Sequence, residues 1–133
     1  MSYKYGSKSR AVLETCCPEI QDIMQEVIKI IDCSPLEGYM DEAKQTNAFN
    51  EKRSKVQFPN SKHNTNPSLA LDVVPYPIDW NNIPRFAQLG GIIKGVALMK
   101  GYKIRCGFDW DMDGEITDNK FMDWPHFEYL GRL

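Results

Sequence analysis

The sequence lacks several features that would assign it directly to a common functional class. It has no excess of basic charge, since 16 lysine and arginine residues stand against 18 aspartate and glutamate residues and the net charge is −2. Without a basic field, nucleic acid is not an expected partner. No apolar run approaches the roughly 18 residues typical of a membrane span, and the N-terminus has no apolar signal segment. We therefore expect no membrane insertion and a protein that is made and kept in the cytoplasm.

Cysteine pairs with metal-binding spacing are also absent. None of the four cysteines belongs to a CxxC motif, and adjacent Cys16 and Cys17 cannot easily bond to each other, so we expect buried, reduced thiols. The 133 residues, 42% of them hydrophobic, suffice for one compact core, and neither an internal repeat nor a low-complexity stretch divides them. The sequence therefore predicts a single domain over residues 1–133.

Hydrophobic periodicity predicts three helices, over about residues 18–33, 42–51 and 84–100. Pro18 stands where a first helical residue should, and Asp41 can cap the second helix. Ser34-Pro35 is expected to end the first helix near Cys33. Gly90-Gly91, in the middle of the third helix, indicates close packing against a sheet.

Short apolar runs predict strands over residues 69–74 and 103–106, and a last strand that begins near His126. Residues 52–67 are polar and proline-containing, which is typical of a long irregular connection, and such connections are usually functional. The order of elements predicts an α+β domain, with about three helices packed on a small, largely antiparallel sheet.

The chain contains only two histidines, and each lies beside carboxylates near a predicted strand. Asp72 stands inside an apolar strand, where a carboxylate needs a partner or a metal. A hydrolytic zinc site typically uses three imidazole or carboxylate ligands and leaves a fourth position for water, and His63, Asp72 and His126 meet that requirement. Asp123, three residues before His126, is placed to act as the base. A single histidine is nevertheless more often a surface or core residue than a ligand.

These residues also resemble a known family. Ser61-x-His63, Ala70-x-Asp72 and Asp123-x-x-His126 are similar to motifs of the zinc D-alanyl-D-alanine carboxypeptidases and, more closely, of the phage L-alanyl-D-glutamate endopeptidases that act as endolysins. Further similar segments are spread over nearly the whole chain and include residues 3–9, 37–39, 53–55, 74–80 and 107–110.

The resemblance implies a Hedgehog/D-Ala-D-Ala-peptidase-like fold and a zinc peptidase. His63, Asp72 and His126 would hold the zinc, and Asp123 would be the catalytic carboxylate. The expected substrate is the stem peptide of peptidoglycan, and the expected protein is a monomer that stays in the host cytoplasm until a holin opens the inner membrane. Two alternatives remain: a D-alanyl-D-alanine carboxypeptidase, and a weakly active zinc-bearing module that binds the wall.

Two departures from the family pattern concern the site. The spacing between His63 and Asp72 is two residues longer than usual, which an outward bulge of the loop can accommodate. The family usually has an arginine where this chain has Met40. That arginine would bind a substrate carboxylate or stabilise the tetrahedral intermediate, so its loss lowers activity unless Lys44 or Arg53 reaches the same place.

An acidic segment precedes Asp123. Asp109, Asp111 and Asp113 alternate before Gly114, as in the first half of a calcium-binding loop, but Lys120 replaces the glutamate expected at the twelfth position. Asp118 could substitute for it. Some phage relatives are similar in carrying a calcium loop here. Calcium is therefore a possible second cofactor, and a solvated acidic turn is the alternative.

Overall fold

The computed structural model describes residues 3–116 and 122–133. In chain order, the elements in these described ranges are α1 (Ser7–Glu14), α2 (Pro18–Val27), β1 (Cys33–Glu37), α3 (Glu42–Asn50), the 3₁₀ turn η1 (Lys62–Asn64), β2 (Ala70–Pro75), α4 (Ile83–Met99), β3 (Tyr102–Cys106) and β4 (His126–Arg132).

The four strands form one sheet in the order β1-β2-β4-β3, and every neighbouring pair is antiparallel. The two central strands place Asp72 directly opposite His126. Further along β4, Glu128 lies opposite Arg105 of the edge strand β3. Because side chains alternate between the faces of a strand, these four residues share one face of the sheet.

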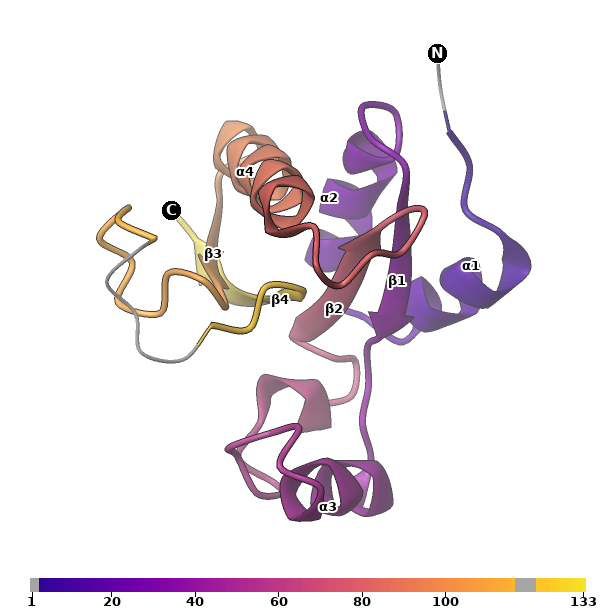
Figure 1. The fold of residues 1–133 in the computed structure, drawn as a ribbon, viewed down its shortest axis with the longest axis vertical. Coiled ribbons are helices and arrows are strands. Elements are labelled where there is room, and N and C mark those ends of the chain that lie inside the picture. Colours follow the sequence, from indigo (N-terminus) through magenta and orange to yellow (C-terminus); the bar gives the residue numbers. More distant parts are fainter. Residues whose placement is uncertain (1–2, 117–121) are drawn as a thin grey trace.

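The other face of the sheet carries the hydrophobic core. Helices α2 and α4 cover it (Figure 1), and the buried apolar side chains that meet there include Ile20, Ile23, Met24, Val27, Leu71, Val73, Leu89, Ile93, Ala97 and Phe127. On the opposite side of the molecule, residues 40–67 form a separate layer with α3 and η1, which we call the α3 lobe (Figure 1). None of the described helices has the length and apolar character needed to cross a membrane.

The first part of the chain differs from the sequence prediction. The helix predicted over residues 18–33 ends at Val27, and residues 33–37, where Ser34-Pro35 was expected only to end that helix, form strand β1. A proline inside a strand argues against a central position, but β1 lies at the edge of the sheet, where the missing N–H of Pro35 is tolerated. Helix α1 was not predicted, because Ser7–Glu14 has only one buried residue, Leu13, and so lacks an apolar stripe.

The remaining α-helices and strands confirm the prediction to within one or two residues, whereas the 3₁₀ turn η1 lies within the connection predicted to be irregular. Asp41 caps α3, since its side chain accepts a hydrogen bond from the backbone N–H of Lys44. Gly90 packs directly against the ring of Phe108, just beyond β3, at a place where no Cβ would fit. All four cysteines are buried free thiols. The fold is therefore the predicted α+β class, and the described residues contain four α-helices rather than about three.

Candidate metal centre

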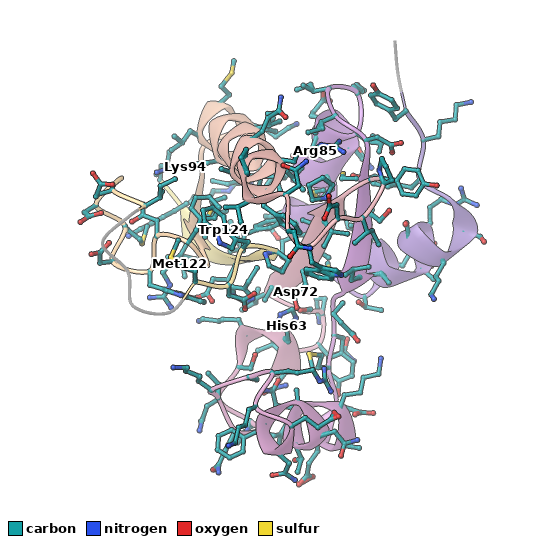
Figure 2. All side chains as sticks on the ribbon, viewed as in Figure 1. His63, Asp72, Arg85, Lys94, Met122 and Trp124 are labelled. Carbon is teal, nitrogen blue, oxygen red and sulfur yellow. The ribbon has the colours of Figure 1, made fainter. Side chains whose placement is uncertain are left out.

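His63, Asp72 and His126 converge at one point, where the α3 lobe meets the sheet; Figure 2 shows His63 and Asp72 at this junction. Their atoms His63 Nε2, Asp72 Oδ1 and His126 Nδ1 form a triangle in which each pair is 3.2 Å apart. His63 belongs to η1, Asp72 to β2 and His126 to β4. The structure thus brings together the three residues predicted from the sequence as a ligand set.

The outer nitrogen of each imidazole is already engaged. His63 Nδ1 lies 2.7 Å from the backbone oxygen of Gly38, and His126 Nε2 lies 2.8 Å from Glu128 Oε1. Both partners are acceptors, so in a neutral imidazole these outer nitrogens carry the proton, and the nitrogens inside the triangle then present lone pairs to a metal. Gly38 lies so close to Thr15 and Cys16 that a Cβ would not fit, so only glycine can occupy this position without displacing its neighbours.

The electrostatics of the triangle favour a positive charge. Burial lowers the pKa of His126, but hydrogen bonds with Asp72 and Glu128 outweigh burial and raise that pKa to about 10. For Asp72, burial raises the pKa, but hydrogen bonds with both histidines outweigh it and hold the pKa well below its usual range. Three lone-pair atoms face one another here, and a single proton can reduce only part of the repulsion among them. A central cation would contact all three atoms.

The donor set and its dimensions fit zinc. A tetrahedral zinc ion with ligands at about 2.0–2.1 Å requires its ligand atoms to be about 3.3 Å apart, close to the separations in this triangle. Two neutral imidazoles and one carboxylate are ligand types that zinc commonly takes at hydrolytic sites. Asp72 is the one residue of β2 that is not fully buried, so the site is open on one side.

Asp123 is held beside the triangle by Gly107, which follows β3. The N–H of Asp123 donates to the Gly107 oxygen at 2.8 Å, and the N–H of Gly107 donates to the His126 oxygen at 2.7 Å. Gly107 contacts the backbone of Asp123 so closely that a Cβ there would collide with it. Burial and the neighbouring charge of Asp72 raise the pKa of Asp123 to about 6. A carboxyl group with such a pKa is suited to exchanging protons near neutral pH.

A cavity of about 440 Å³ opens over the triangle. Its lining includes Asp123 and the three candidate ligands His63, Asp72 and His126, which we call the metal triad. Its other walls come from the α3 lobe and β3, with four cationic side chains: Arg53, Lys55, Lys62 and Arg105. Met40 also lines the cavity. Of the two residues suggested as replacements for the missing family arginine, Arg53 lines the cavity, whereas Lys44 does not and pairs instead with Glu37 at 3.5 Å.

Glu128 and Arg105 were not recognised from the sequence. Glu128 is buried and accepts hydrogen bonds from His126 and from Arg105 Nη2, each at 2.8 Å. Burial raises the pKa of Glu128, but these two partners outweigh burial and lower it. The i, i+2 spacing of His126 and Glu128 on a predicted strand was the available signal, since alternate residues share a face. Arg105 could not be found in this way, because its role depends on strand pairing.

The acidic segment groups a second set of carboxylates, distinct from the metal triad. Asp109, Asp111 and Asp113 bring one carboxylate oxygen each within 4.8 Å of one another. Asp109 is buried, accepts a hydrogen bond from the Gly114 N–H at 3.0 Å and lies 3.8 Å from Lys94 Nζ. Asp118, the fourth predicted calcium ligand, falls outside the described residues. Three of the four predicted carboxylates are therefore grouped, and calcium itself stays a prediction.

Comparison with known proteins gives consistent matches along the chain. A family model described as phage L-alanyl-D-glutamate peptidase matches residues 1–130. The L-alanyl-D-glutamate peptidase of Escherichia phage T5 is 29% identical over 124 residues, which cover 89% of each chain.

Two solved structures share the fold. The L-Ala D-Glu endopeptidase ChiX of Serratia marcescens superposes with a TM-score of 0.75 at 21% identity, covering 95% of this chain and 89% of its own. The vancomycin resistance D,D-dipeptidase VanXYg, solved in complex with a D-Ala-D-Ala phosphinate analogue, gives a TM-score of 0.54 at 23% identity, covering 85% of this chain and 48% of its own.

Proposed function

Because the chain belongs to the phage L-alanyl-D-glutamate peptidase family, we propose that it is a zinc endopeptidase that cuts the L-alanyl-D-glutamate bond of peptidoglycan stem peptides. His63, Asp72 and His126 are the proposed ligands. The observation that carries this assignment is the triangle of three donor atoms, each 3.2 Å from the other two, with both histidines oriented by outer hydrogen bonds.

The residues around the triangle have separate tasks in this reaction. A bound zinc ion supplies Lewis acidity for the attack of water on the peptide carbonyl. Asp123 accepts the proton of the attacking water and gives it to the departing amine of the D-glutamate residue. Gly38 and Glu128 keep the two imidazoles in the tautomers that leave their inner nitrogens available. Gly107 holds the backbone of Asp123 at the edge of the cavity.

The cavity also suits an anionic substrate. A glutamate residue that continues a peptide through one carboxyl group leaves its other carboxyl free, close to the bond that is cut. Lys62 lines the cavity, directly precedes His63, and has no ion pair within residues 3–116 and 122–133. By contrast, Arg105 and Arg53 pair with Glu128 and Glu51. We therefore assign the free carboxylate of the substrate to Lys62, with Arg53 as a further cation of the cavity lining.

The test is mass analysis of the fragments released from purified cell walls by zinc-loaded protein. Cleavage at the proposed bond leaves new N-terminal D-glutamate residues, whereas a D-alanyl-D-alanine carboxypeptidase releases free D-alanine and a binding module releases nothing. His63→Ala and Asp72→Ala should lose both zinc and cleavage. Asp79→Ala, an exposed aspartate outside the cavity, is the matched control. Full activity and one equivalent of zinc in the ligand variants would contradict the assignment.

The proposal extends to the place of action. The enzyme acts as a monomer on the wall after a holin has opened the inner membrane of the host. Production of the enzyme alone should therefore leave cells intact until the membrane is permeabilised from outside. Lysis without permeabilisation would show that release does not depend on a holin.

Calcium at Asp109, Asp111 and Asp113 is proposed as a second, separate cofactor site. Its support is the grouping of three carboxylates in a segment that leads towards Asp123, since a cation would reduce their mutual repulsion.

A further inference from the structure

His126 is held along one edge by Glu128. The two side chains point to the same side of β4, and Glu128 Oε1 lies 2.8 Å from His126 Nε2. Glu128 is only 4% exposed, so water competes little for this hydrogen bond. The contact fixes which nitrogen of His126 carries the proton, but a single hydrogen bond still allows the ring to rock about its axis.

The face of the same imidazole is covered by Trp110. The centroids of the two rings are 5.3 Å apart, with 35° between their planes. Trp110 comes from the segment after β3, so its contact with His126 is independent of β4. Glu128 and Trp110 together restrict both the edge and the face of the ligand.

Arg105 joins these two restraints. Its Nη2 donates to Glu128 Oε2 at 2.8 Å, and its Cζ lies 5.5 Å from the centroid of the Trp110 ring. The contacts therefore form a closed ring, in which each residue touches two others. We call this group the His126 clamp; it consists of His126, Glu128, Arg105 and Trp110. Because Arg105 lies opposite Glu128 in the register of β3 and β4, the backbone of the sheet sets the position of the clamp.

We propose that Arg105 is a positioning residue of the metal centre, which acts through Glu128 and Trp110 to hold His126 in the orientation that binds zinc. The inference rests on the proposed zinc site and adds a function to a residue outside the ligand set. A planar guanidinium can donate to a carboxylate and cover an aromatic face at the same time, which an ammonium group cannot do equally well. Arg105→Lys should therefore restore only part of what Arg105→Met loses.

The experiment measures the zinc affinity of the full chain by competition with a chromophoric chelator. It also records the visible spectrum of the cobalt-substituted protein, which reports ligand geometry. Arg105→Met should weaken zinc binding roughly 10-fold to 100-fold, as is typical when a residue supporting a metal ligand is lost. Arg132→Met is the matched control, because Arg132 also lies over an aromatic ring, that of Tyr102 at 5.4 Å, but away from the metal triad.

A double substitution tests the route of action. If Arg105 acts partly through Glu128, the variant Arg105→Met/Glu128→Gln should lose less zinc affinity than the sum of the two single losses. Losses of zinc affinity that add in the double variant would show that Arg105 does not act through Glu128. If, in addition, the cobalt spectrum of Arg105→Met is that of the wild type, the clamp itself is wrong. Arg105→Lys, which keeps the positive charge, serves if Arg105→Met does not fold.

The outcomes also separate this inference from the zinc assignment itself. His126→Ala is measured in parallel, and its loss of zinc is required by the proposed function alone. If His126→Ala loses zinc while Arg105→Met keeps wild-type affinity and spectrum, the clamp is wrong and the zinc site stands. If Arg105→Met changes only KM for cell-wall fragments, Arg105 contacts substrate and is not a positioning residue.

Discussion

Asp123→Asn should make the metal-free protein more stable at neutral pH while it removes activity. Burial and the charge of Asp72 raise the pKa of Asp123 from its ordinary 3.8 to about 6. The folded protein therefore binds this proton more tightly than the unfolded chain does. At a pH well below 3.8 both states are protonated and the charge costs nothing. As the pH rises through about 6, the folded state must hold an unfavourable charge, which corresponds to at most about 3 kcal/mol.

Asparagine has a similar shape but no charge, so it removes this cost. The variant's gain in unfolding free energy should rise from about 1 kcal/mol near pH 4.5 to at most about 3 kcal/mol near pH 8. Urea unfolding of zinc-free wild-type and variant proteins across this range measures the difference. In the zinc-loaded enzyme, the same substitution should lower turnover by ~10²-fold to 10⁴-fold with zinc still bound, because asparagine cannot accept the proton.

Two results would refute this reasoning. A stability difference that is the same at both ends of the pH range would mean that the carboxyl group is not perturbed in the folded protein. Loss of zinc from Asp123→Asn would make Asp123 a ligand rather than a proton carrier. Asp79→Asn, at an exposed position, should show neither effect and serves as the control.

Three further predictions concern the surroundings of the site. Gly107→Ala should lower kcat roughly 100-fold with zinc retained, because the added Cβ collides with the backbone of Asp123 and displaces it. Gly91→Ala is the control, since nothing lies within 4 Å of a Cβ at that position. Equal activities of the two variants would contradict the packing argument. Lys62→Ala should raise KM for cell-wall fragments roughly 10-fold with little change in kcat, as expected when a charge-assisted hydrogen bond to substrate is lost. Lys103→Ala is the control. An unchanged KM in Lys62→Ala would show that Lys62 does not bind the substrate. Calcium titration of the zinc-loaded protein, followed by tryptophan fluorescence, should show saturable binding that Asp111→Asn weakens, whereas the absence of binding at millimolar calcium would leave an acidic turn.

The sequence predicted the regular elements best where an apolar pattern was strong. Helix α4 and strand β2 lie close to their predicted bounds because their buried residues dominate the local sequence. Strand β1 was missed for a physical reason: Ser34 and Pro35 are poor strand residues, and only pairing with β2 at the edge of the sheet makes the conformation favourable. Such pairing is a long-range effect that local periodicity does not contain.

For the candidate site, the chemical type of the residues predicted the ligands better than their spacing in the sequence did. With two histidines in the chain, ligand type alone favoured His63 and His126, and an aspartate in an apolar strand pointed to Asp72. Glu128 and Arg105 are ordinary charged residues by sequence, and only the register between β3 and β4 places one beside the other. The orientation of the imidazoles likewise depended on Gly38, 25 residues before His63, which no spacing rule connects to it.

The direct pairing of Asp72 with His126 makes the proposed metal centre a reporter of correct folding. These two residues face each other across β2 and β4, while Leu71 and Phe127, one position along, also face each other on the core side. A slip of either strand by one residue would move its ligand into the hydrocarbon interior and its core residue into the cavity. A chain with that error would have neither an intact core nor a metal site. The zinc content per molecule should therefore measure the fraction of chains in a refolded preparation whose strands have the correct register, without any assay of catalysis.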